Sequence, residues 1–473
     1  MARPAAGGAL TPGVAAGHPA TAAAGVEILE EGGSAADAAV AAGLASCVAE
    51  TVMTGLLGGG HAIHFDAATG AARTLDCFCA APGLGAPARE AELVHLEVPF
   101  GAELVHYAVG PASCAVPGVP AGLDALWRAH GRLPWERLVE PALRLARDGV
   151  AMPPAHVACL AMLETVFTMR EGARIYAPGG ALLRAGERLE QPGLVAALES
   201  LAAEGAAGAY TGTIGSALLA LSEERGGLLT AADLARYRVE WAEPVETPWV
   251  GLRFLGRGGL SGVPAVLARL PRLRDLSPTE RVVALTGALG AEVGLETHTT
   301  NLVAVDGQGN ACVLTTSLGL GSGDWLPGLD LHLNSMLGEA DLLVEPLRPG
   351  ERMQSMMAPS LALDRDGLAL AIGAAGGTRL RTALVTVAAG ILDRGLAPQP
   401  AVDAPRVHVA RGVANAEPGA DEAALAALEA SGLAVRRWPE QHHYFGGVSA
   451  IGRTGAAADP RRSGAALSPR PAG

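Results

Sequence analysis

The spacing of apolar and polar positions predicts helices followed by strands in the first part of the chain. Residues 20–31 (ATAAAGVEILEE) are predicted to form a helix that Gly32-Gly33 ends. Ser34 then caps a second, Ala-rich helix, with Asp37 three residues later as a loose capping box. The stretches "GLLGGGHAIHFDAATG" and "RTLDCFC" are predicted to hold two successive strands. This hairpin pattern favours an antiparallel sheet over alternating βαβ units.

Hairpins return in the second half of the chain. Strands are predicted at Thr300–Val305 and Ala311–Thr316, joined by the turn "DGQGN". The stretch "PSLALDRDGLALAIG" is a further hairpin that turns at residues 364–367, and the helix "TRLRTALVTVAAGILDRG" follows it. Residues 118–148 are predicted to be helical, and residues 191–242 helical with loops. Near the end we expect a helix and strand in "LAALEASGLAVRRW" and a last strand in "YFGGVSAIGRTG".

Composition and charge narrow the class of protein. The 473 residues are 49% hydrophobic and 18% charged, with a formal net charge of −13. A nucleic-acid-binding protein needs a basic surface, so an acidic enzyme without a nucleic-acid partner is expected. No transmembrane helix or convincing leader is visible, so we expect a cytoplasmic protein without a membrane partner. The six cysteines form no CxxC pair, and reduced thiols are expected.

Several common catalytic motifs are missing from the sequence. There is no GxSxG elbow, no GK[ST] phosphate loop and no HExxH zinc motif. His61 and His64 are three residues apart on a predicted strand and would face opposite sides, which argues against a metal pair. No metal and no cofactor are therefore expected.

Thr299, at the start of a predicted strand, offers a different chemistry. A hydroxyl is a weak nucleophile unless a base lies beside it, and an N-terminal Thr can use its own α-amine as that base. An internal Thr becomes N-terminal only if the preceding peptide bond is cut, and its hydroxyl can make that cut by attacking the preceding carbonyl. The alternative is structural, because β-branched residues favour strands anyway.

Gly376-Gly377 lies between a predicted strand and a predicted helix in "GAAGGTRL". Backbone N–H groups exposed at such a junction can form an oxyanion hole. An ordinary strand–helix turn would use the same residues.

Taken in order, the motifs of the chain resemble those of the γ-glutamyltransferase (γ-glutamyltranspeptidase) family of N-terminal-nucleophile hydrolases. The matching stretches run from "GVAAGHPATAAAGVEILEEGGSAADAAVAA" through "TTNLVAVDGQGNA" and "MAPSLALDRDGLALAIGAAGGTRL" to "GGVSAIGR". The resemblance implies an α+β fold, an αββα sandwich of two stacked antiparallel sheets flanked by helices. It also implies autocatalytic cleavage between His298 and Thr299. The large-subunit region 1–298 and the small-subunit region 299–473 would then remain one intertwined domain, a heterodimer of the two pieces.

The resemblance also assigns roles to residues. Thr299 would be the nucleophile and, through its amine, the base, with Thr297 and Thr300 as competing candidates. Ser317 would support the nucleophile with its hydroxyl, and the Gly pair would form the oxyanion hole. Ser355 would bind the substrate's α-carboxylate, and Glu339 would hold its α-amino group.

The sequence departs from the family pattern around the expected substrate pocket. Phe78 stands where the family has an Arg that clamps the α-carboxylate of the γ-glutamyl group, and Phe cannot make that bidentate pair. The second carboxylate-binding serine is Met356, the His after the Thr pair is Asn301, and a polar loop residue is Gly319. The segment after Trp249 is also shortened. The catalytic residues are therefore kept, while the pocket is more apolar.

Three hypotheses follow for the function. The first is a γ-glutamyl hydrolase or transferase that acts on amides such as glutathione, with water, an amino acid or a dipeptide as acceptor. The second is an acylase-like amidohydrolase with an apolar acyl pocket, which Phe78 and Met356 motivate. The third is a non-catalytic family member that binds a ligand or partner, which the intact Thr299, Ser317 and Gly pair argue against.

Overall fold

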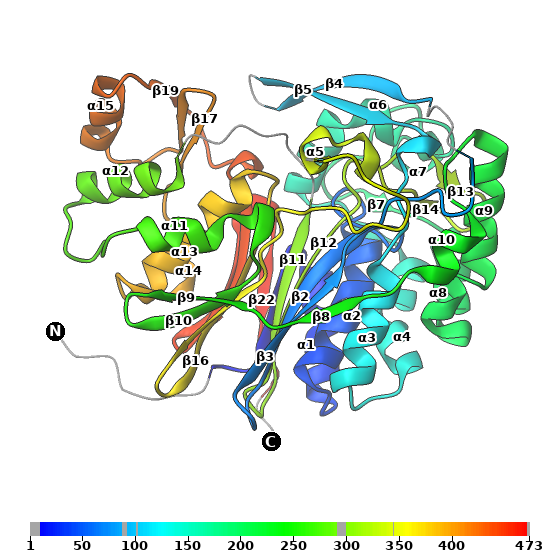
Figure 1. Cartoon of the computed structure of the whole chain (residues 1–473), viewed down its shortest axis with the longest axis horizontal. Helices are drawn as coiled ribbons and strands as arrows, with labels where there is room; N and C mark the ends of the chain where they lie inside the picture. Colours follow the sequence, from blue (N-terminus) through cyan, green and yellow to red (C-terminus); the bar gives the residue numbers. More distant parts are fainter. Residues whose placement is uncertain (1–9, 88–91, 101–102, 291–298, 344, 471–473) are drawn as a thin grey trace.

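The chain folds into two facing β-sheets with helices on both outer sides (Figure 1). This computed structural model describes residues 10–87, 92–100, 103–290, 299–343 and 345–470. In order across the first sheet lie β22 (Ala465–Leu467), β1 (Gly13–Ala16), β11 (Thr300–Val305), β12 (Ala311–Ser317), β2 (Gly59–Asp66), β3 (Ala71–Cys77) and β8 (Glu240–Ala242). The second sheet consists of β21 (Gly455–Ala458), β20 (Gly447–Gly452), β16 (Gly367–Ala375), β15 (Ser360–Asp364), β10 (Leu252–Gly256) and β9 (Val245–Trp249). Neighbouring strands in both sheets are antiparallel.

The two sheets bury one shared core between them. Val303 and Val313 of the first sheet meet Leu361 and Ala371 of the second in a single apolar cluster. The alternate positions of the same strands, such as Leu302, pack instead against helices. Because both faces of β11 are covered, all its residues are buried, and the strand lacks the polar alternation of a half-exposed sheet.

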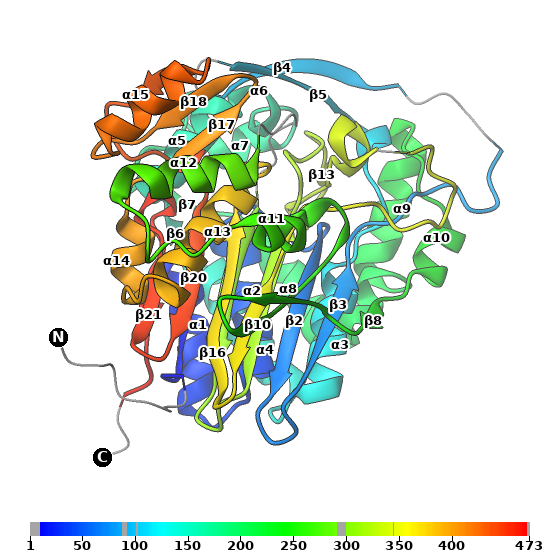
Figure 2. The same cartoon turned by 60° about the vertical axis from the view of Figure 1, so that its left-hand side comes forward.

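Helices cover the outer face of each sheet (Figures 1 and 2). The first sheet is covered by α1 (Pro19–Glu30), α2 (Ala35–Ala49), α3 (Val119–His130), α4 (Trp135–Asp148), α8 (Gly193–Glu204) and α9 (Thr213–Arg225). The second sheet is covered by α11 (Val263–Arg269), α12 (Pro278–Leu289), α13 (Arg379–Leu392) and α14 (Pro398–Asp403). The layers are therefore helix, sheet, sheet and helix, which confirms the predicted αββα sandwich.

Helix α2 lies directly against the first sheet because its sequence gives it no polar face. All 15 of its residues are buried. The predicted capping box is present, since Ser34 accepts from the Asp37 N–H and the Asp37 carboxylate accepts from the Ser34 N–H. Gly43 lets Leu123 and Leu314 approach the helix axis closely. The residue at its C-terminal end is Glu50, whose carboxyl group is also buried.

Both predicted hairpins of the second half are confirmed. In β11–β12, Thr300 pairs with Thr316 and Val305 with Ala311 around the turn at residues 306–310. In β15–β16, the turn lies between Asp364 and Gly367. Helix α13 follows β16 after three residues, as the pattern predicts.

The sequence pattern misses strands built from small residues. The strand predicted in "YFGGVSAIGRTG" is confirmed as β20, but it is not the last strand, because β21 (GAAA) and β22 (AAL) follow it. β1 (GVAA) also escapes the pattern. Such short strands offer few of the β-branched and aromatic residues on which strand prediction depends. The predicted helical stretch 118–148 is two helices, α3 and α4, separated at residues 131–134.

Smaller elements surround the sandwich at one end. The helices are α5 (Pro154–Met162), α6 (Glu164–Phe167), α7 (Gly172–Tyr176), α10 (Ala231–Arg236) and α15 (Glu422–Ala430). The strands are β4 (Val94–Phe100), β5 (Glu103–Val109), β6 (Val150–Ala151), β7 (Arg188–Leu189), β13 (Trp325–Leu326), β14 (Leu331–His332), β17 (Val407–Ala410), β18 (Val413–Ala416) and β19 (Ala434–Arg437). Figure 2 shows the β4–β5 hairpin extended across this end of the molecule. No helix among the described residues is long and apolar enough to cross a lipid bilayer.

Candidate active site

Thr299 lies at the end of the first sheet, immediately before β11. Since Thr300 pairs with Thr316, continuing the register places Thr299 opposite Ser317, the last residue of β12. Thr299 and Ser317 are each 1% exposed. The Ser317 Oγ accepts a hydrogen bond of 2.8 Å from the Gly319 N–H. The hairpin thus holds the two hydroxyl residues side by side on a rigid support.

The residues that the sequence singles out converge on one cavity beside Thr299. Its described lining includes Phe78, Thr299, Ser317, Glu339, Ser355 and Gly377. They come from positions between 78 and 377, so only the tertiary fold brings them together. Gly376 does not line this cavity, but it directly precedes Gly377.

The Gly pair forms the junction between β16 and α13, as predicted. Gly376 has φ of +129° and Gly377 has φ of +59°, conformations that other residues adopt with strain. A Cβ on Gly376 would lie 2.7 Å from Gly446 Cα. The helix N-terminus adds the positive end of its dipole at this point. Backbone N–H groups at such a junction are suited to binding a developing negative oxygen.

The Glu339 carboxyl is fully buried in the same cavity. A Cβ on Gly319 would overlap Glu339 Oε1 and would lie 2.7 Å from Ser335 Oγ. Gly319, where the family pattern has a polar residue, thus leaves room for this carboxylate. Glu339 is the only ionisable side chain among the described residues that line the cavity.

Phe78 forms an apolar wall of the cavity. It is 1% exposed and belongs to a cluster with Met336, Met353 and Met357. Its ring stacks on His61 with 5.5 Å between the ring centroids. Methionine side chains adapt their shape readily, so this wall can accommodate an apolar group.

Two arginines lie behind Phe78 without lining the cavity. Arg352 Nη1 donates to the Phe78 carbonyl, and its Nε is 3.5 Å from an Asp76 oxygen. Arg257 Nη1 donates to the Met357 carbonyl at 3.1 Å, and its Nη2 is 3.6 Å from Asp76. Both guanidinium groups therefore have protein partners. Neither takes the place of the Arg that the family pattern has at position 78.

The competing candidates for the nucleophile differ in their surroundings. The Thr300 hydroxyl points away from the cavity just described and donates to Glu50, and the other Glu50 oxygen accepts from Thr21 at 2.7 Å. Thr297 and His298 lie outside the described residues. Sequence reasoning missed Glu50. The available signal was a lone acid at the end of a helix that has no polar face.

Metal ligands do not gather in the part of the chain that the structure describes. No three His, Cys, Asp or Glu side chains there come together in a metal-binding group.

The αββα sandwich and its strand-end Thr facing a Gly pair define the class of N-terminal-nucleophile hydrolases. The gamma-glutamyltranspeptidase family model matches residues 21–284 and 286–468, and the chain belongs to that family. It is therefore an enzyme of the hydrolase and acyltransferase kind.

Known relatives include acylases and glutathione hydrolases. The Acylase ACY 1 proenzyme of Pseudomonas sp. (strain SE83) is 30% identical, over 93% of this chain and 89% of that protein. Glutathione hydrolase proenzyme 1 of Schizosaccharomyces pombe is 27% identical, over 91% of this chain and 79% of that protein. The crystal structure of cephalosporin acylase from Bacillus halodurans shares the fold, with a TM-score of 0.80 and 24% identity, over 99% of this chain and 97% of that one.

Proposed function

We propose that this protein is a self-cleaving amide hydrolase that removes an acyl group without an α-carboxylate, with Thr299 as its nucleophile. The observation that carries the proposal is the apolar wall of Phe78 and methionines where a γ-glutamyl group would need a cation. The 30% identity to an acylase proenzyme supports this assignment.

The chain's own residues supply the chemistry. Cleavage before Thr299 leaves two associated pieces, residues 1–298 and 299–473, and frees the Thr299 amine. That amine takes the proton of Thr299 Oγ1 while the oxygen attacks the substrate carbonyl. The N–H groups of the Gly376-Gly377 junction stabilise the oxyanion, and the Ser317 hydroxyl supports the nucleophile. The ammonium protonates the leaving amine, and water then hydrolyses the Thr ester.

The polar groups of the cavity define the acyl group further. Ser355 Oγ accepts a 3.2 Å hydrogen bond from the Met357 N–H, so its own hydrogen can point to a substrate. Glu339 is suited to a substrate ammonium group. A substrate carboxylate would meet no positively charged side chain among the described lining residues and would be repelled by Glu339. The preferred acyl group therefore carries an amine but no carboxylate.

A γ-glutamyl hydrolase or transferase is the second candidate. The retention of Ser355 and Glu339 favours it, as does the similarity to a glutathione hydrolase proenzyme. Its acceptor would be water, an amino acid or a dipeptide.

Three p-nitroanilides that differ by one group each separate the two candidates. They carry γ-glutamyl, 4-aminobutyryl and butyryl groups, so the first two differ only by the α-carboxylate. We expect kcat/KM to be highest for 4-aminobutyryl, because a charge-assisted contact to Glu339 contributes about 1.5–3 kcal/mol, roughly 10- to 100-fold over butyryl. A γ-glutamyl rate above the 4-aminobutyryl rate would instead establish the second candidate.

Two variants provide the controls for this series. Glu339→Gln keeps the size of the side chain but removes its charge, so the preference for 4-aminobutyryl over butyryl should disappear while butyryl hydrolysis stays. Thr299→Ala should neither cleave itself nor hydrolyse any anilide. Denaturing mass spectrometry of the wild type should show the fragments 1–298 and 299–473. Hydrolysis by an intact chain would contradict the mechanism.

A further inference from the structure

A second cavity lies on the other side of Thr299 and plays no part in the mechanism above. Its polar lining includes Glu50, His156, Thr299, Asp459 and Arg462. Thr299 is the one described residue that it shares with the substrate cavity. The amine that cleavage would free belongs to the residue between these two cavities.

Glu50 is held firmly at this second cavity. The hydroxyls of Thr21 and Thr300 each donate to one of its carboxylate oxygens. A Cβ on Gly17 would lie 2.5 Å from Glu50 Oε2 and 2.9 Å from Thr300 Oγ1, so only glycine leaves this space open. The residue directly after Thr299 is therefore tied to the end of α2 through this carboxylate.

Arg462 places a positive charge at the same cavity. It is 6% exposed, its Nη1 lies 3.2 Å from Met53 Sδ, and its Nε has no hydrogen-bond partner among the described residues. It also lies near the Gly pair, since a Cβ on Gly376 would be 3.2 Å from Arg462 Nη2. Glu50 and Arg462 therefore bring opposite charges to the cavity that Thr299 also lines.

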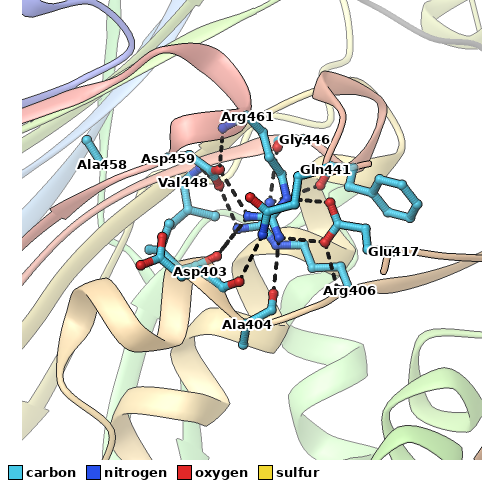
Figure 3. A network of polar contacts seen from close by, with 12 residues as sticks. Asp403, Ala404, Arg406, Glu417, Gln441, Gly446, Val448, Ala458, Asp459 and Arg461 are labelled. Atoms are coloured by element: carbon cyan, nitrogen blue, oxygen red, sulfur yellow. Dashed lines mark hydrogen bonds and ion pairs between the residues drawn. The ribbon is translucent and has the colours of Figure 1, made fainter. Parts of the chain in front are cut away.

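The other ionisable groups of this cavity are already committed. Asp459 binds Arg406 at 2.6 Å and Arg461 at 3.1 Å in a buried network that also contains Glu417 (Figure 3). His156 of α5 has its pKa lowered to about 3, chiefly by burial, and stays neutral. Burial raises the pKa of Glu50 to about 7. The hydrogen bonds from the two threonines and the charge of Arg462 lower this pKa, but by less than burial raises it. Glu50 is therefore ionised in mildly alkaline solution.

We propose that Glu50 is a positioning residue that orients the first residues of β11 through Thr300 and, with Arg462, sets the proton affinity of the Thr299 amine. This inference rests on the proposed function, because it needs the free amine. The amine must be neutral to accept the Oγ1 proton, and it is an ammonium once it has done so. A carboxylate nearby stabilises the ammonium, and a guanidinium destabilises it. Together the two charges keep the pKa of the amine low enough for the amine to be neutral before the reaction and high enough for it to accept the Oγ1 proton.

The pH dependence of kcat/KM tests the electrostatic part, since its acidic limb reports the essential base of the free enzyme. Glu50→Gln keeps the shape and hydrogen-bonding capacity of the side chain but removes its charge. The amine then loses an anion and keeps Arg462, so its pKa falls, and the acidic limb should move about one unit to lower pH. Arg462→Gln should move the limb to higher pH.

Thr300→Val tests the positioning part. It removes the hydroxyl that donates to Glu50, so kcat should fall. Because this hydrogen bond lowers the pKa of Glu50, its loss also leaves less of Glu50 ionised, and the acidic limb should move in the same direction as in Glu50→Gln but less far. The proposal would be overturned if the acidic limb of the kcat/KM profile fell at the same pH in the wild type, Glu50→Gln and Arg462→Gln. An intact Glu50→Gln chain would overturn it too, because Glu50 would then act in self-cleavage, before any amine exists. Where Glu50→Gln fails to fold, the shift in Arg462→Gln decides.

A readout without substrate separates this inference from the proposed function. Cyanate carbamoylates only neutral amines, and the mass of the 299–473 fragment reports the modification. The pH midpoint of this reaction should move as the acidic limb does. If the wild type is cleaved but hydrolyses none of the anilides, the proposed substrate class fails while the cyanate midpoints still test Glu50. If the wild type is not cleaved at all, both proposals fail.

Discussion

At the residue scale, the small size of particular glycines decides where charged groups can lie. Gly319 leaves room for the Glu339 carboxylate, and Gly17 leaves room for that of Glu50. Neither carboxylate could reach its cavity past a methyl group. Each glycine thus acts by leaving space for a carboxylate. Because glycine has no reactive group of its own, neither position stands out as functional in the sequence.

Gly17→Ala tests this directly. The backbone of Gly17 has no positive φ, so alanine is compatible with it, and the clash with Glu50 is the main effect. We expect overpacking to cost about 1–3 kcal/mol of stability. Loss of the Glu50–Thr300 hydrogen bond should lower kcat/KM about tenfold. Urea unfolding and anilide kinetics measure the two effects.

Gly287→Ala is the matched control for this substitution. Gly287 is exposed in α12, and an added Cβ there would meet no atom within 4 Å. Stability should stay equal or rise by up to about 1 kcal/mol, with unchanged kinetics. Equal activity of Gly17→Ala and the wild type would show that the space at Gly17 is not needed to hold Glu50.

At the element scale, the candidate chemistry lies where elements end. Thr299 directly precedes β11, Ser317 ends β12, and the Gly pair joins β16 to α13. Strand ends fix the hydroxyls, and the start of α13 supplies N–H groups that have no partner within the helix. The two sheets thus bring the proposed nucleophile and the proposed oxyanion donors together at one end of their shared core.

Gly376→Ala should uncouple these elements. Its φ of +129° is strained for alanine, and the added methyl would meet Gly446. The junction must shift, and losing one oxyanion donor costs roughly 10²–10³-fold in kcat. Gly395→Ala, at the other end of α13 with φ of +73° and open space, should cost about 1 kcal/mol of stability and no activity. Wild-type kcat in Gly376→Ala would exclude these N–H groups as oxyanion donors.

Sequence reasoning could single out candidate residues at element ends because short motifs mark them. A Thr pair before a β-hairpin and a Gly pair between strand and helix are local patterns, and one residue of each pair, Thr299 and Gly377, lines the cavity. Glu50 and Arg462 have no local pattern. They come from the end of α2 and from the C-terminal segment, and only the packing of both against β11 makes them neighbours. The strand β1 was missed for a similar reason, since "GVAA" becomes a strand through pairing with β11 and β22.

At the scale of the whole molecule, the predicted subunit regions 1–298 and 299–473 contribute strands to both sheets. In the first sheet, β11 and β12 lie between β1 and β2. In the second, β15 pairs with β10. Separating two such pieces would expose the shared core between the sheets. Cleavage before Thr299 would therefore leave the assembly intact, as the heterodimer prediction requires.

Several histidines spread over the described part of the molecule are buried and have lowered pKa values. Burial lowers the pKa of His18 to about 4, and that of His64, His156, His332 and His408 to about 3. In the unfolded chain these rings titrate near 6.5. Below that pH the unfolded state binds protons that the folded state does not, so stability is lost as pH falls. Glu50 and Asp76, whose pKa values burial raises, act in the opposite direction, whereas His61, whose pKa burial lowers well below 6.5, adds to the effect of the five rings.

We therefore expect acid to unfold this protein at mildly acidic pH. Each ring contributes about 1.4 kcal/mol per pH unit between its two pKa values, so five together approach ~7 kcal/mol per unit, against a typical total of about 5–15 kcal/mol. The urea midpoint should fall steeply between pH 6.5 and pH 5. His332→Gln, which keeps an acceptor for the Gly323 N–H, should reduce this slope by about the share of one ring. A midpoint that stays level from pH 7 to pH 5 would mean that these rings do not govern the acid stability of the fold.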